Sequence, residues 1–90
     1  MSTQQRPYFM YIALQDDDKI SIFTVDPETG KTNLEQDVQV PGGPAPLAID
    51  PSHNFLYVGR RGSQEIASYK IDHSNGGLSL IGTAPARSRL

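Results

Sequence analysis

Apolar residues occur along this chain in short runs, and no window shows the apolar period of a helix. Residues 8–14 and 55–60 are rich in aromatic and β-branched side chains, which is typical of strands buried on both faces. Residues 19–25 and 65–71 follow as second strands. Each places a small, an aromatic and a branched residue on one face: Ser21, Phe23 and Val25, then Ala67, Tyr69 and Ile71. The pattern therefore predicts an all-β fold.

Three further strands are predicted on weaker apolar content. Residues 34–40 alternate between the two faces, which is typical of an outer strand with one face in water. Residues 78–83 are its weaker counterpart, and residues 47–50 form a strand that precedes 55–60. The face of 34–40 that we expect to be buried holds Leu34, Gln36, Val38 and Val40.

The predicted turns agree with these strands. Residues 26–30 and 72–76 each begin with Asp and end with Gly, and they separate two strands. In such a turn the Asp side chain bonds the local backbone and the Gly supplies a positive φ. Both segments are therefore expected to be hairpin turns.

The chain repeats itself at an offset of 46 residues. Identical pairs at this offset include Phe9 on Phe55, Tyr11 on Tyr57, Ile20 on Ile66, Asp26 on Asp72 and Gly30 on Gly76. A shortening of the second turn by two residues is expected to bring Leu34 onto Leu78 and Pro41 onto Pro85. Four strands repeated every 40–50 residues or so are the signature of a β-propeller blade.

The repeat divides the chain into two blades and two tails. Residues 1–7 are expected to be a flexible tail, and residues 8–41 an incomplete blade that lacks its inner strand. Residues 42–85 form a complete four-stranded blade, and residues 86–90 an atypical C-terminal tail. The fold class is thus all-β, a β-propeller fragment of about two antiparallel blades.

The second blade resembles a known family. Residues 46–59 read Pro-Leu-Ala-Ile-Asp-Pro-Ser-His-Asn-Phe-Leu-Tyr-Val-Gly, and residues 66–72 read Ile-Ala-Ser-Tyr-Lys-Ile-Asp. They look like a blade of the seven-bladed lactonase family, which contains the propeller-type 6-phosphogluconolactonase and the fungal carboxy-muconate lactonizing enzyme. The resemblance implies the N-terminal region of such an enzyme, with catalytic residues on later blades beyond residue 90. Related surface-repeat propellers share some of these elements.

The size of the chain agrees with a piece of a larger ring. Propellers close with roughly 4–8 blades, and this chain holds fewer than two. Only 21 of its 90 residues are Leu, Ile, Val or Phe, which is few for a domain that must cover its own core. We expect a truncated, frameshifted or cleaved product whose partners are the missing blades, or a fragment that self-associates. A short gene product that builds a ring from several copies is the other possibility.

Composition excludes several classes of partner. The net charge of −2 gives no electrostatic reason to expect nucleic acid or an anionic membrane. The chain has no cysteine, and its longest apolar run is far short of the roughly 20 residues of a membrane helix. A cytoplasmic protein without a disulfide or a thiolate metal site is therefore expected.

Candidate chemistry is confined to the loops at one end of the blades. Arg60 and Arg61 are the candidate substrate-binding residues, because a guanidinium grips a phosphate or carboxylate in two places. That suits the small anionic lactone or carboxylate that the family resemblance implies. The alternative is that both are surface arginines at a strand end.

The other polar motifs are better explained by turns and loops than by a ligand site. Residues 16–18 are three Asp without the spacing of a calcium loop, so a solvated hairpin loop is expected. The Pro-Gly-rich residues 41–46 lack the spacing of a phosphate loop, and a crossover between blades explains them better. His53 and His73 lie in turns at the opposite end without ligand spacing. No metal, no cofactor and no catalytic residue is predicted within the chain.

Two functions follow. The first is a segment of a lactonase or lactonizing enzyme that acts on a sugar-acid lactone such as 6-phosphogluconolactone and is inactive alone. The second is a non-enzymatic propeller repeat that serves as a binding scaffold or self-assembles. A pocket lined by His, Glu and Arg on the inner strands would distinguish the enzyme from the scaffold.

Overall fold

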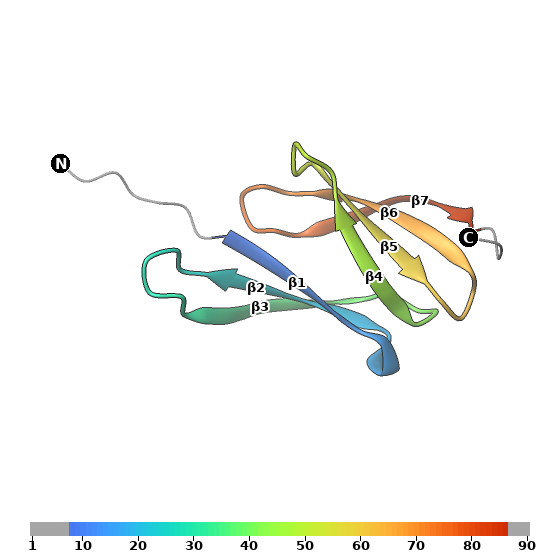
Figure 1. Cartoon of the computed structure of the whole chain (residues 1–90), viewed down its shortest axis with the longest axis horizontal. Helices are drawn as coiled ribbons and strands as arrows, with labels where there is room; N and C mark the ends of the chain where they lie inside the picture. The colour runs from blue at the N-terminus through green and yellow to red at the C-terminus, as the bar shows by residue number, and fades with distance from the viewer. Residues whose placement is uncertain (1–7, 87–90) are drawn as a thin grey trace.

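The computed structural model describes residues 8–86, which form seven strands in two antiparallel sheets (Figure 1). Sheet A has the order β1-β2-β3 and sheet B the order β4-β5-β6-β7. The strands are β1 (Tyr8–Leu14), β2 (Lys19–Val25), β3 (Thr32–Gln39), β4 (Pro44–Ile49), β5 (Phe55–Arg60), β6 (Glu65–Ile71) and β7 (Leu78–Pro85). The all-β prediction is confirmed. The predicted tail at 1–7 and residues 87–90 of the second tail lie outside the described residues.

Four strands, β1, β2, β5 and β6, have the predicted bounds. The other three are longer than predicted, because backbone pairing continues where the side chains are no longer apolar, although β3 and β4 each end one residue before the predicted end. β4 begins at Pro44, which pairs with Arg60, although the prolines favoured a loop there. Proline is tolerated in β4 because this strand lies at the edge of its sheet and pairs on one side alone.

A β-bulge in β3 corrects the predicted faces of that strand. Phe23 pairs with Leu34 and Ile22 pairs with Gln36, so one extra residue stands between them on β3. An extra residue moves the side chains that follow it to the other face of the sheet. Leu34 therefore does not share a face with Val38, as the simple alternation had predicted, and it is 56% exposed.

The turn before β7 corrects the predicted shortening of the repeat. Val25 pairs with Thr32 across the first hairpin, and Ile71 pairs with Leu78 across the second. Each member of the second pair lies 46 residues after its counterpart. The two hairpin turns thus have equal length, and Leu80, not Leu78, is the counterpart of Leu34.

The closing segments of the two sheets repeat with the same offset. The Val40 amide donates to the Asp18 carbonyl at 2.8 Å, and the Ala86 amide donates to the Gln64 carbonyl at 2.8 Å. Asp18 and Gln64 both adopt the left-handed conformation, with φ of 53° and 56°. The two repeats therefore share individual backbone hydrogen bonds at equivalent positions.

The core lies between the two sheets. Ile20 of sheet A and Leu56 and Val58 of sheet B are fully buried there. Ala67 and Tyr69 of sheet B are buried in the same core. Full burial of an aliphatic side chain stabilises a fold by about 1.5–3 kcal/mol. Because these side chains come from both sheets, neither sheet has a complete core by itself.

A turn of sheet B is seated on two aromatic residues of β1. The Tyr11 hydroxyl donates to the Gly76 carbonyl at 2.7 Å, and partial burial raises the pKa of that hydroxyl. A Cβ atom on Gly76 would lie 2.6 Å from Cδ1 of Phe9. Gly76 also has a φ of +75°, so glycine is required there both by the backbone and by the neighbouring ring.

The described residues contain one short 3₁₀ helix, η1 (Gln15–Asp17), and no α-helix. None of the helical structure within residues 8–86 has the length or the apolar character that crossing a membrane would need.

Substitution of the two turn glycines tests the inter-sheet contact. Gly30 has the same φ as Gly76, +76° against +75°, but a Cβ atom there would meet nothing within 4 Å. We expect Gly30→Ala to cost about 1–2 kcal/mol from backbone strain, and Gly76→Ala to cost a further ~1–3 kcal/mol from overlap with Phe9. Urea unfolding of both variants measures the difference. Equal losses would contradict the packing of Phe9 on this turn.

Candidate functional site

The loops of the two sheets gather at opposite ends of the strands (Figure 1). The connector end holds η1, the connector (residues 40–43, between β3 and β4) and the β5–β6 loop (residues 61–64). Backbone bonds join the last two: the Arg61 amide donates to the Gly43 carbonyl at 3.1 Å, and the Gly62 amide to the Gly42 carbonyl at 2.7 Å. The turn end holds the hairpin turns and the β4–β5 turn.

The connector itself is folded around two glycines. Gly42 and Gly43 have φ of 99° and 71°, and a Cβ atom on Gly42 would lie 2.9 Å from the Ser63 hydroxyl. The Gly43 amide donates to the Asp18 carboxylate at 2.9 Å, so this amide does not face an open anion site. The contacts agree with a crossover between blades.

The three aspartates differ from the predicted solvated loop in one respect. Asp16 and Asp17 are exposed in η1, but the carboxylate of Asp18 binds the connector 25 residues further along the chain. The left-handed backbone of Asp18 aims both its carbonyl and its side chain at this segment. Asp18 therefore links sheet A to the connector by a hydrogen bond. The local sequence gave no sign of so distant a partner.

The Arg60 guanidinium makes two polar contacts with other residues. Its Nε donates to the Pro41 carbonyl at 2.6 Å, and its Nη1 lies 3.2 Å from Oε1 of Glu65, with 18% of the side chain exposed. Two of the five guanidinium donors are thus committed to the connector and to β6. Arg60 fixes the connector, and its side chain is largely buried by these contacts.

Arg61 is exposed, and its side chain makes no hydrogen bond or ion pair with other residues of the described range 8–86. Both arginines line a cleft of about 620 Å³ that also touches Tyr57, Gln64 and Glu65. The structure therefore places the two predicted residues side by side but in different environments. Arg61 is the better placed of the two to meet an anion.

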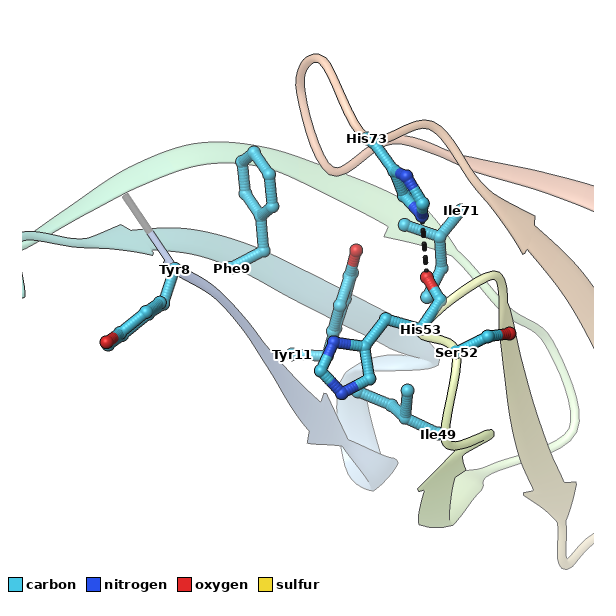
Figure 2. A pocket seen from close by; sticks show the side chains of 8 residues that line it. All are labelled: Tyr8, Phe9, Tyr11, Ile49, Ser52, His53, Ile71 and His73. Atoms are coloured by element: carbon cyan, nitrogen blue, oxygen red, sulfur yellow. Dashed lines mark hydrogen bonds between the residues drawn. The ribbon is translucent and has the colours of Figure 1, made fainter. Parts of the chain in front are cut away.

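A second cleft, of about 450 Å³, opens at the turn end between the two sheets (Figure 2). It is lined by Tyr8, Phe9, Tyr11, Ile49, Ser52, His53, Ile71 and His73. Nε2 of His73 lies 2.8 Å from the His53 carbonyl, so the two histidine turns lie side by side. The sequence predicted both turns at this end. The cleft itself depends on how the two sheets lie relative to each other, which no local pattern predicts.

The polar groups of the turn end serve the turns. Asp50 accepts hydrogen bonds from the amides of Asn54 and Phe55 at 2.8 and 2.7 Å and from the Ser52 hydroxyl. The Ser52 hydroxyl and these amides hold the pKa of Asp50 below its ordinary value, and the amide of residue 28 does the same for Asp26. Among residues 8–86 no group of three or more His, Asp or Glu side chains is placed to hold a metal ion.

Comparison with known proteins identifies the family. The model of the family "Lactonase, 7-bladed beta-propeller" matches residues 41–90, which is more than half of the chain. The chain belongs to this lactonase family of seven-bladed β-propellers. Sheet B, with its four antiparallel strands, is the blade that the family model covers.

Similar sequences occur among the lactonases. The chain is 40% identical over 76 residues to a 6-phosphogluconolactonase of Yersinia pestis and 33% identical over 75 residues to one of Klebsiella pneumoniae. The aligned segments cover 84% and 83% of this chain but only 22% of each relative. The chain thus spans about a fifth of the length of the curated lactonases that it matches.

Solved structures share the fold. A periplasmic gluconolactonase of Pseudomonas aeruginosa superposes with a TM-score of 0.73 at 18% identity, over 98% of this chain and 29% of that one. A protein from Lactobacillus plantarum superposes with a TM-score of 0.70 at 20% identity, over 93% of this chain and 28% of that one. At such identities the likeness concerns the propeller fold, and it confirms the predicted blades of this lactonase-family chain.

Proposed function

We propose that this chain is a two-blade segment of a lactonase that hydrolyses a sugar-acid lactone such as 6-phosphogluconolactone, and that it is inactive alone. The observation that carries the proposal is the 40% identity, over 84% of the chain, to a protein named 6-phosphogluconolactonase. Family membership supports the reaction class, and the anionic substrate in that name suits the arginines at the connector end.

The chemistry explains why two blades are not sufficient. Hydrolysis of a lactone needs a general base to activate water and donors or cations to stabilise the oxyanion that forms on the ester carbonyl. At the connector end, Arg60 and Arg61 are the cationic side chains that line the cleft. Asp18 is bonded to Gly43 and Glu65 is paired with Arg60, so neither carboxylate is placed as a base. The base is therefore assigned to other blades of a complete ring.

Within this proposal the two arginines have different roles. Arg61 provides the exposed guanidinium that grips the phosphate or carboxylate of the substrate. Arg60 keeps the connector in place through Pro41 and orients the loop that carries Arg61. The carboxylate of Glu65 holds Arg60 against the sheet and leaves Arg61 as the anion contact.

Anion binding tests the role of Arg61. We expect the 90-residue chain to bind 6-phosphogluconate, and Arg61→Gln to weaken that binding at least about tenfold, because a hydrogen bond to a charged group is worth about 1.5–3 kcal/mol. Titration followed by NMR measures both dissociation constants. Lys31→Gln, at the turn end, is the matched control and should bind like the parent. Equal binding by the parent and Arg61→Gln would contradict the assignment.

Activity tests the claim that the segment is incomplete. We expect the 90-residue chain to hydrolyse 6-phosphogluconolactone no faster than buffer, because the general base lies elsewhere in the ring. The complete 6-phosphogluconolactonase of Yersinia pestis serves as the positive control in the same assay. Turnover by the 90-residue chain comparable to that of the complete enzyme would overturn this part of the proposal.

A further inference from the structure

Each sheet has one face that the other sheet does not cover. On sheet B this outer face carries Phe55, Tyr57 and Ile66, with Tyr57 and Ile66 each 38% exposed. On sheet A the outer face carries Met10, Ile12, Phe23, Val25 and Leu34, with Ile12 37% exposed. Exposed apolar side chains grouped on one face are typical of a surface that binds another protein.

The outer face of sheet B repeats a face that is already covered in this chain. Forty-six residues earlier, the same pattern of Phe, Tyr and Ile occurs as Phe9, Tyr11 and Ile20 on the inner face of sheet A. Ile20 is fully buried there, and Phe9 and Tyr11 hold the Gly76 turn of sheet B. The outer face of sheet B is therefore shaped to receive a sheet that resembles sheet B.

The outer face of sheet A provides such a sheet. At the same offset, Met10 and Ile12 correspond to Leu56 and Val58, two fully buried residues of the inner face of sheet B. Phe23, Val25 and Leu34 correspond in the same way to Tyr69, Ile71 and Leu80. The Gly30 turn, with φ of +76°, matches the Gly76 turn with φ of +75°.

Three polar side chains of this outer face already have partners. The Ser21 hydroxyl donates to Asp37 at 2.6 Å, and the Lys19 amine lies 3.2 Å from the same carboxylate. These contacts hold the pKa of Asp37 below its ordinary value, with the Ser21 bond as the largest cause. Because satisfied polar groups are much less costly to cover than unsatisfied ones, the face can be covered by an apolar surface.

We propose that this face of sheet A binds the outer face of sheet B in a second copy of the chain, head to tail, in the geometry of the chain's own inter-sheet contact. The Tyr57 hydroxyl of one copy would donate to the Gly30 carbonyl of the next, as Tyr11 donates to Gly76 within the chain. Such an interface is heterologous, so it continues from copy to copy until the assembly closes into a ring or extends.

A pair of matched substitutions tests the interface. Ile12→Lys places a charge on the outer face of sheet A, and Ile66→Lys places one on the outer face of sheet B. We expect the parent chain to increase in mass with concentration in analytical ultracentrifugation, and each variant alone to remain a monomer. Leu80→Lys is the control, because Leu80 is 59% exposed but lies on neither outer face, and it should assemble like the parent.

Mixing the two variants gives the decisive result. Ile12→Lys keeps an intact sheet B face and Ile66→Lys an intact sheet A face, so a mixture should form a dimer that cannot grow further. Formation of this dimer also shows that both variants are folded. A mixture that stays monomeric, or a parent chain that is monomeric at every concentration, overturns the proposal.

A smaller change tests the predicted hydrogen bond. Tyr57→Phe removes only the hydroxyl that would reach Gly30 of the next copy, and we expect it to weaken association about fivefold, as for loss of one neutral hydrogen bond. Thr83→Val is the control, because it removes an exposed hydroxyl from the inner face of sheet B, where Thr83 pairs with Ala67, and it should associate like the parent. Unchanged association of Tyr57→Phe would contradict the proposed register of the two copies.

Discussion

The seating of the Gly76 turn on Phe9 and Tyr11 fixes how the two sheets of this chain lie together. The turn approaches the Phe9 ring so closely that no side chain fits, and the Tyr11 hydroxyl bonds its carbonyl. The core that includes Ile20, Leu56 and Val58 is buried because this contact brings the two sheets face to face. The connector supports the same arrangement from the other end, where Asp18 binds the Gly43 amide.

The sequence predicted this fold to the extent that the signals were local or repeated. Runs of apolar residues gave the bounds of β1, β2, β5 and β6, and the offset of 46 residues gave the pairing of the two blades. The bulge in β3 was missed, because an extra residue such as Glu35 leaves the hydrophobic alternation of a short strand unchanged. The error then placed Leu34 on the wrong face. The shortened turn came from beginning both outer strands at their first leucine, whereas β3 begins at Thr32.

The candidate site was predictable in place but not in detail. Arg60 ends β5 and Arg61 follows it directly, so their position at the connector end could be inferred from the topology of a blade. Their different surroundings could not, because Pro41 and Glu65 meet Arg60 only in the folded chain. The tie from Asp18 to Gly43 and the cleft at the turn end also depend on segments far apart in sequence.

One measurement tests the central claim that the two blades form a single packed unit through this turn. In the NMR spectrum of the 90-residue chain, we expect nuclear Overhauser effects from the Phe9 and Tyr11 rings to the Gly76 backbone, and a Gly76 Hα resonance displaced by the Phe9 ring. In the Ile66→Lys variant, which presents no intact sheet B face to a second copy, the Gly30 turn has the same backbone but no such neighbour and should show neither effect. Absence of these effects at Gly76, with two sheets that tumble independently, would contradict the packing of the two blades through this turn.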